Sequence, residues 1–299
     1  MTDLDVRDLP ADGPADGPRR AAGSIPGPGS LTWRYAGDWR GGLTARATLL
    51  LQVAHPVVGA GVADHSGFLE DRWGRLIRTM ESTFDFLGYR GDERGRGEAA
   101  RLREIHKDIK GVDAQGRRYH ALNPEAYLWV HATLFHGMVQ TQELFGRRPL
   151  TPDRERALFA EWRELALALG ITERHLPAGP DAFREYFDAM VEERLEYNDT
   201  VRLLIDLDRK PLPPPPRWPL PVFAWSGIAV PPTVLLRRVG VGALPPVLRE
   251  RFQLRWTAAD DLRFRAFARS MRAADTVMID GLRQSPIASR ATRRARRGR

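Results

Sequence analysis

The chain has 299 residues, 42% of them hydrophobic and 28% charged, which is typical of a globular protein. It contains no cysteine, which excludes disulfides, thiolate nucleophiles, zinc ribbons, cysteine-held iron–sulfur clusters and thiolate-ligated haem. No run approaches the roughly 18 apolar residues that a membrane span needs. The acidic, proline-rich N-terminus has no apolar core of a secretory signal, so we expect a cytoplasmic protein.

The formal net charge of +8 arises mainly at the C-terminus. Six of the last ten residues are arginine, and without them the net charge is +2. Composition therefore predicts a basic disordered tail over residues 286–299 and a disordered Pro/Gly/Asp-rich segment over residues 1–30. The tail could simply be solvated, or it could touch RNA or an anionic lipid surface. No motif for specific nucleic-acid recognition accompanies it.

Helical signals dominate the first half of the remaining chain. An apolar run over residues 40–54 predicts a helix that ends before His55, where glycines then break the pattern. Apolar residues at a clean helical period predict an amphipathic helix over residues 72–87. The stretch RLREIHKDIKG, residues 101–111, predicts a further helix closed by Gly111.

The second half continues the helical pattern. Asn123 is placed to cap a helix that is apolar on nearly every side, which indicates burial at the centre of the molecule. Three more helices are predicted over residues 152–170, 181–208 and 256–283. Between them, residues 211–221 form a polyproline crossing, and residues 222–254 are broken by Gly and Pro. Because convincing strands are scarce, we predict an all-α fold with a single large helical domain over residues 31–285.

Three of the seven histidines lie among apolar residues: His55, His106 and His131. A neutral imidazole buried among apolar side chains needs a partner for at least one nitrogen. Each can therefore be a core histidine with a hydrogen bond, or a ligand of a bound group, and periodicity does not decide between the two. The usual catalytic signatures, such as H-E-x-x-H, G-x-S-x-G and the P-loop, are absent.

Arg75 and Thr79 are four residues apart and share one face of the predicted helix over residues 72–87. That face is turned away from the apolar stripe. Arg75 and Arg78 can simply be solvent-exposed. Alternatively, the helix is buried on both sides, and an arginine faces a bound anion or cofactor, such as the propionates of a haem.

Four motifs then occur in order: LLLQVAHPVVGAGVADHSGF, GRLIRTMESTF, EIHKDIKG and YHALNPEAYLWVHATL. They resemble the catalytic-domain family of rubber oxygenase (latex-clearing protein) and the mycophenolic-acid-pathway oxygenase, formerly a domain of unknown function. The resemblance spans roughly residues 35–285. It implies an all-helical domain around a buried pocket that binds a non-covalent haem b.

The resemblance also implies roles for particular residues. His106 would be the metal ligand on the proximal side of the iron. Arg75 and Thr79 would be catalytic and would line the haem pocket, with Arg75 holding a propionate or polarising oxygen. His131 would be a structural group near the haem. Arg78 would also line the cofactor, but it stands where the latex-clearing enzymes have a lysine that can cap the iron. Since a guanidinium stays protonated and is a poor iron ligand, we expect an open or water-bound distal position.

Together these patterns lead us to expect a haem-b-dependent oxygenase that uses O2 on a small apolar substrate, of isoprenoid or other unsaturated lipid-like type. A non-catalytic haem sensor or carrier is one alternative, and a cofactor-free helical interaction protein is another. A non-haem iron or zinc hydrolase using His55, His65 and His106 is a further, weaker alternative, because no carboxylate accompanies these histidines at a recognisable spacing. We expect no specific nucleic acid and no transmembrane segment, while peripheral membrane contact and the oligomeric state stay open.

Overall fold

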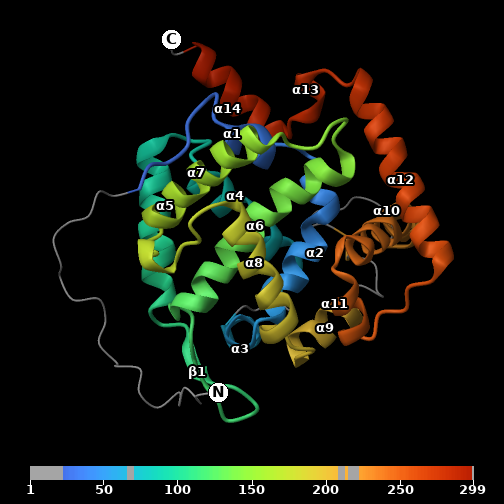
Figure 1. Ribbon diagram of the computed structural model, residues 1–299. Helices are drawn as coiled ribbons and strands as arrows, with labels where there is room; N and C mark the ends of the chain where they lie inside the picture. The colour runs from blue at the N-terminus through green and yellow to red at the C-terminus, as the bar shows by residue number, and fades with distance from the viewer. Residues whose placement is uncertain (1–22, 66–70, 208–212, 215–221, 298–299) are drawn as a thin grey trace.

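The computed structural model describes residues 23–65, 71–207, 213–214 and 222–297. Within these ranges it confirms the predicted all-α single domain, with one short two-stranded sheet beside the helices (Figure 1). The first half of the chain contains α1 (Leu31–Ala36), α2 (Gly41–Ala54), α3 (Pro56–His65), α4 (Arg72–Phe86), α5 (Asp92–His106), β1 (Lys110–Val112), β2 (Arg118–His120) and α6 (Pro124–Phe145). The second half contains α7 (Pro152–Ala168), η2 (Glu173–His175), α8 (Pro180–Ala189), η3 (Met190–Arg194), α9 (Asp199–Leu207), α10 (Val222–Ala243), α11 (Pro246–Arg251), α12 (Ala258–Val277), α13 (Asp280–Arg283) and α14 (Pro286–Arg297).

Helix α6 runs through the centre of the molecule, as its all-round apolar sequence predicted (Figure 1). The Asn123 side chain accepts hydrogen bonds from the first backbone N–H groups, which confirms the predicted cap. Helix α2 packs against α6 in the antiparallel direction. Trp129, fully buried, donates to the carbonyl of Leu51, while Gln52 donates to the hydroxyl of Thr133. These side chains satisfy the buried polar groups of an interface that is otherwise apolar.

Helices α4 and α5 form an antiparallel hairpin. The turn between them contains Gly88 at φ 77° and Gly91 at φ 113°, which are conformations that suit glycine and few other residues. Trp33 anchors the turn because its indole N–H donates to the carbonyl of Leu87. The hairpin places the first turns of α4 beside the last turns of α5, so the segments around Arg75 and His106 lie near one another.

The expected closure of this helix at Gly111 is wrong. Helix α5 ends at His106, and Gly111 lies in strand β1 opposite Tyr119 of β2. A Cβ atom on Gly111 would stand 2.8 Å from the hydroxyl of Tyr119, so the glycine serves a close approach inside the hairpin. Tyr119 in turn donates to Asp64 at the end of α3. This hydrogen bond therefore attaches the β1–β2 hairpin to α3.

Two further expectations failed because packing overrides local breaker residues. Residues 56–65 form α3 despite their glycines, since Gly59 packs directly against Asn198 and the carbonyl of Val53. Residues 222–243 form the continuous helix α10 although Pro231 and Pro232 lie within it. Conversely, the predicted helix over residues 181–208 is divided into α8, the π-turn η3 and α9, with Leu195 in extended backbone between them. The last predicted helix, over residues 256–283, is likewise divided into α12 and α13.

The composition also overstated disorder at both ends. Ser24 donates to Glu164, and Ile25 is buried, so the part of the predicted disordered segment that the structure describes, residues 23–30, packs on the domain. The basic tail forms α14, whose Ala288 and Ala291 are buried. Small alanines on one face let an arginine-rich helix pack closely. Residues 1–22 and 298–299 lie outside the described part of the chain.

The polyproline crossing also lies outside the described residues, apart from Pro213 and Pro214. At that point the indole of Trp73 on α4 donates to the carbonyl of Pro213 at 2.8 Å. Among the helices that the structure describes, none is long and apolar enough to cross a membrane alone. Only α2 and α3 taken together reach that length and composition, across a bend of 100°.

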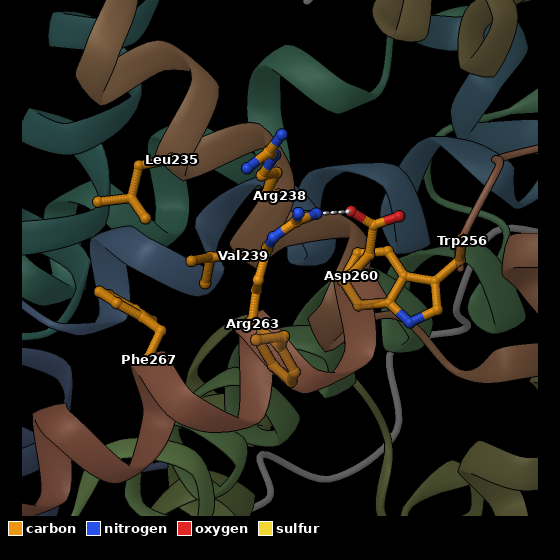
Figure 2. Close-up of a pocket in the computed structure, with 8 residues that line it drawn as sticks. Leu235, Arg238, Val239, Trp256, Asp260, Arg263 and Phe267 are labelled. Carbon is orange, nitrogen blue, oxygen red and sulfur yellow. Dashed lines mark ion pairs between the residues drawn. The ribbon is translucent and has the colours of Figure 1, made fainter. Parts of the chain in front are cut away.

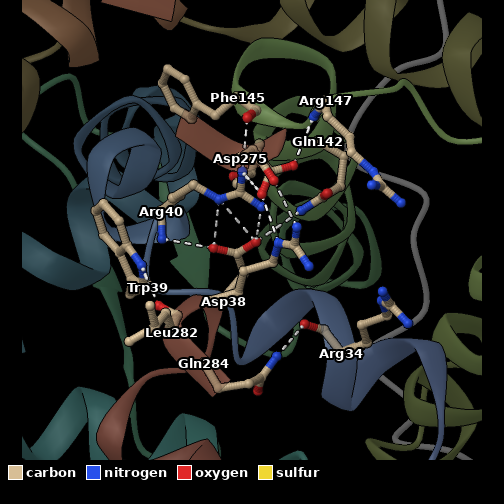
Figure 3. Close-up of polar contacts among 12 residues, drawn as sticks. Arg34, Asp38, Trp39, Arg40, Gln142, Phe145, Arg147, Asp275, Leu282 and Gln284 are labelled. Atoms are coloured by element: carbon tan, nitrogen blue, oxygen red, sulfur yellow. Dashed lines mark hydrogen bonds and ion pairs between the residues drawn. The ribbon is translucent and has the colours of Figure 1, made fainter. Parts of the chain in front are cut away.

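A buried network of charges joins distant parts of the chain (Figure 3). The guanidinium of Arg40 forms ion pairs with Asp38 and with Asp275 of α12, and it donates to the carbonyl of Phe145 at the end of α6. Arg283 of α13 also pairs with Asp275. Arg40 is 1% exposed, so these contacts lie inside the domain, where they join the start of α2 to α6 and α12.

Candidate functional site

His106 is the last residue of α5, and its ring is half-buried. The ring nitrogen Nδ1 lies 2.5 Å from the carbonyl oxygen of Leu102, one turn earlier. A carbonyl can only accept, so Nδ1 carries the proton and Nε2 keeps its lone pair. Within the described residues Nε2 has no hydrogen-bond partner. The side chain is therefore oriented by the backbone and presents a basic nitrogen.

The pKa of His106 lies below its ordinary value. Burial is the main cause, and the positive charges of Arg101 and Arg75 add to it, against an opposing effect of the hydrogen bond to Leu102. Protonating the half-buried ring would add a positive charge close to these two arginines. His106 is accordingly neutral at neutral pH, which is the form that binds a metal ion.

Arg75 lies near the start of α4 and is half-buried. Full solvent exposure was one of the two alternatives that the sequence left open for this residue. Burial lowers its pKa from the ordinary value, and the neighbouring Arg78 lowers it further. Contacts between the two helices, Asp85 with Arg94 and Ser82 with Glu98, show that they run antiparallel, so Arg75 and His106 lie at the same end of the α4–α5 hairpin. The structure thus brings together two residues that lie 31 positions apart in the sequence.

Much of the apolar stripe of α4 faces outward. The sequence pattern suggested a stripe packed on the core, but only its last part, Phe84 and Leu87, is buried. Four large apolar side chains of α4 and α5 are exposed instead: Leu76, Ile77, Met80 and Ile105. Single exposed apolar residues are common, whereas several on one hairpin indicate a binding surface.

Thr79 and Arg78 are both exposed on α4. Thr79 follows Arg75 by one helical turn, and its carbonyl accepts a hydrogen bond from Thr83. Arg78 forms an ion pair at 3.1 Å with Asp71, the N-cap of the helix. This contact holds the guanidinium at the surface in the present structure, and the part of Arg78 in cofactor binding stays a prediction.

Sequence reasoning missed Tyr127. Its ring lies edge-on to His106, with the ring centroids 5.6 Å apart. Its hydroxyl is buried and has no hydrogen-bond partner among the described residues, and burial raises its pKa to about 12. Tyr127 precedes His131 by four residues on α6, so the helical spacing from the singled-out histidine is the signal that could have found it.

His131 has the geometry of a core histidine. It is buried, its Nε2 donates to the carbonyl of Trp162, and its ring stacks on the indole of Trp162 at 4.9 Å. Burial lowers its pKa to about 4 despite that hydrogen bond, so the ring is neutral. The edge of Phe86, the last residue of α4, contacts the same ring. His131 therefore joins α6, α7 and the end of α4, in keeping with a structural group behind the hairpin.

The histidines of the metal-hydrolase alternative do not converge. His55 donates to Glu125, and this hydrogen bond, with help from Arg194 and against the effect of burial, lowers the pKa of Glu125 to about 2. His65 lies against Tyr119 instead. Across the described residues no three histidines or carboxylates form a cluster that could hold a metal ion. The observed arrangement gives this alternative no support.

A hollow lies between α10 and α12 (Figure 2). The apolar side chains of Val239, Phe264 and Phe267 line it, together with Arg238 and Arg263. Helices α10 and α12 form the opposite side of the molecule from α5 (Figure 1). This hollow is therefore separate from the surroundings of His106.

Comparison with known proteins identifies the family of this chain. The family described as the ER-bound oxygenase mpaB/B'/Rubber oxygenase catalytic domain matches residues 33–273. The chain belongs to this family. The match includes every candidate residue named above, from Arg75 to His131, and it ends before α13 and α14 begin. The chain is thus an oxygenase-family catalytic domain with a C-terminal extension outside the matched region.

The relatives found in the same way carry no assigned activity. The uncharacterized proteins Mb2261 of Mycobacterium bovis and Rv2237 of Mycobacterium tuberculosis are each 26% identical to this chain over 249 residues. The aligned region covers 79% of this chain and 89% of each relative. No solved structure matches. The family therefore supplies the oxygenase class, and the cofactor and substrate must be argued from the residues.

Proposed function

We propose that this protein is a haem-b-dependent oxygenase that acts with O2 on a small apolar substrate of isoprenoid or other unsaturated lipid-like type. The observation that carries the proposal is the state of His106. Its Nδ1–H is held by the Leu102 carbonyl, its Nε2 is available, and Arg75 and the ring of Tyr127 lie beside it.

The residues present fit a haem. The porphyrin itself supplies four ligands to the iron, so one axial histidine suffices, and a cluster of three protein ligands is not needed. The hydrogen bond from Nδ1–H to a backbone carbonyl is the usual support of a metal-binding imidazole. Arg75 offers a cation to a propionate, and Tyr127 offers an aromatic ring edge and a buried hydroxyl that has no partner among the described residues.

His106 would hold the iron through Nε2, and the Leu102 carbonyl would keep the ring orientation and raise the basicity of that nitrogen. Arg75 would bind a propionate and so fix the position of the cofactor. When bound, haem would supply the redox-active iron that O2 chemistry requires. The ring of Tyr127 would shield this side of His106 from water, and Thr79, one turn after Arg75 on the same face of α4, would be the nearby hydroxyl that could orient reactants.

The alternatives make different predictions for the same residues. A cofactor-free interaction module requires no convergence of His106 and Arg75, whereas the structure brings them to one end of the hairpin. A haem sensor or carrier would share the site but would consume no O2 with substrate. O2 uptake in the presence of an isoprenoid alkene separates it from an oxygenase. The cytoplasmic location stays a prediction, which fractionation of cells would test.

The decisive test is the absorption spectrum of the purified protein before and after reduction with dithionite. We expect an intense Soret band that shifts on reduction, and we expect His106→Ala to lose it. The control is His120→Ala, because His120 is an exposed histidine of β2. Its Nε2 donates to the Lys107 carbonyl and so offers no lone pair to a metal ion. A colourless protein that takes up no added haemin would refute the proposal, as would an unchanged spectrum in His106→Ala.

A further inference from the structure

The turn between α12 and α13 carries an exposed apolar tip. Val277 is 83% exposed, Ile279 is 68% exposed and Leu282 is 64% exposed. Trp39 extends this tip, because its indole N–H donates to the carbonyl of Leu282 while much of its ring is exposed. Large apolar side chains grouped in this way on a surface commonly mark a contact with a membrane or another molecule.

Helix α14 follows the tip and is strongly basic. It contains no acidic residue. Its exposed arginines are Arg290, Arg293, Arg294, Arg296 and Arg297. Within the described residues none of them forms an ion pair, and Arg294 alone makes a hydrogen bond, to the carbonyl of Tyr89. The opposite face of the helix is fixed to the domain by the buried Ala288 and Ala291. The helix therefore presents five exposed guanidinium groups that have no carboxylate partner among the described residues.

The tip and the basic helix lie along the same edge of the molecule, at the top of Figure 1. They are tied to the body of the domain by backbone hydrogen bonds, since Ser285 donates to the carbonyl of Gly37 and Asp38 pairs with Gln284. This extension lies beyond residue 273, where the family match ends. Its properties are accordingly those of this chain and are independent of the proposed haem chemistry.

We propose that α13 and α14 dock the protein on the surface of an anionic lipid bilayer. The apolar tip would enter the region between headgroups and acyl chains, and the arginines of α14 would contact lipid phosphates. The combination of charge and apolarity favours this occupant. A nucleic acid would use the cations but would gain little from exposed Val277 and Ile279, and a stable protein interface usually buries about 800 Å² on each partner, more than a few tip side chains provide.

The test is flotation of the full-length protein with vesicles of phosphatidylcholine alone or of phosphatidylcholine mixed with phosphatidylglycerol. We expect binding to the anionic vesicles only, weakened by high salt because surface charges are then screened. The combined variant Ile279→Asp and Leu282→Asp should lose most of the binding. Each arginine of α14 replaced by glutamine should lower the partition coefficient about fivefold.

Matched controls lie on α12. Leu262 is 64% exposed, as Leu282 is, and it stands at the other end of that helix, so Leu262→Asp should leave binding unchanged. Arg269→Gln removes an exposed arginine outside α14 and should have little effect. Helical circular dichroism would confirm that each variant is folded, which is expected because the replaced side chains are exposed.

Three results would overturn the proposal. The first is no binding to anionic vesicles, or binding that the tip and α14 variants leave intact. The second is a dimer in light scattering that the tip variants convert to a monomer without any vesicle binding, since a second copy would then cover the tip. The third is tight binding to RNA that depends on the same arginines in the absence of vesicle binding.

Discussion

At the scale of single residues, the unpartnered polar atoms around His106 are the clearest sign of a site. Buried hydroxyls in folded proteins nearly always have a hydrogen-bond partner, because burial without one costs about 1–3 kcal/mol. Tyr127 has no such partner among the described residues, although it lies against the histidine that we propose to bind iron. We infer that its hydroxyl is available to a bound group.

This inference predicts that Tyr127→Phe weakens haem binding without destabilising the haem-free protein. In the haem-free protein, removal of an unpaired hydroxyl should leave the free energy of unfolding unchanged or raise it by about 1 kcal/mol. With haem bound, affinity should fall by about fivefold, as expected for one lost hydrogen bond of about 1 kcal/mol. Urea unfolding and haem titration measure the two quantities.

The control for this prediction is Tyr119→Phe. The hydroxyl of Tyr119 donates to Asp64, so its removal should lower the free energy of unfolding by about 1 kcal/mol. It should leave haem affinity unchanged, because Tyr119 belongs to the β1–β2 hairpin and contacts α3. A haem-free Tyr127→Phe variant that is clearly destabilised would show that its hydroxyl already has a partner, and the inference would fail.

At the scale of elements, local signals and packing decided different parts of the fold. The cap at Asn123 and the periodicity of α4 predicted two helices well, since these features depend on nearby residues. Helix α3 and helix α10 were missed because glycine and proline weaken a helix by a few kcal/mol at most, and contacts with distant segments outweigh this. Sequence spacing alone could not reveal such contacts, nor that α5 stops at His106.

Gly111 illustrates this dependence on distant contacts and gives a second prediction. Alanine at this position would place a methyl group 2.8 Å from the Tyr119 hydroxyl and about as close to its ring. The ring would have to move away from Asp64, and we expect Gly111→Ala to lower the free energy of unfolding by about 1–3 kcal/mol. Urea denaturation measures the change.

Gly97 is the matched control because it lies inside α5 with nothing near its missing side chain. Gly97→Ala should raise the free energy of unfolding by about 0.5–1 kcal/mol, since alanine restricts the unfolded chain and favours the helix. If the two variants changed stability equally, close approach at Gly111 would not be the reason for its glycine.

At the scale of the whole molecule, the motifs predicted His106 and Arg75 as site residues, and the fold accounts for their proximity. The α4–α5 hairpin brings them to one end, while α6 supplies Tyr127 from behind. The sequence did not predict the buried contacts of Arg40, which join the end of α6 to α12 (Figure 3). These partners are separated by more than a hundred residues in the sequence, so no local sequence pattern predicts their contacts.

Removing Arg40 should therefore affect the entire domain. Arg40→Met leaves Asp38 and Asp275 buried with fewer partners, and loss of one member of a buried pair costs about 3–5 kcal/mol. Arg156→Met is the control, because its ion pair with Asp153 is exposed and should contribute at most about 1 kcal/mol. Thermal and urea unfolding would compare the two variants, and equal effects would contradict a stabilising role for the buried contacts of Arg40.

The same network predicts how stability depends on pH. Burial alone would raise the pKa of Asp275, but the hydrogen bond from the Arg147 N–H and the charges of Arg283 and Arg40 outweigh burial and lower it. A carboxyl group with a lowered pKa in the folded state contributes stability above its ordinary pKa of about 3.9 and loses it as the pH falls further. In Arg40→Met one of these charges is gone, the pKa of Asp275 rises, and acid unfolding should begin at a higher pH than in the unmodified protein. Fluorescence-monitored acid titration of both proteins measures this shift, and coincident curves would show that Arg40 does not control the ionisation of Asp275.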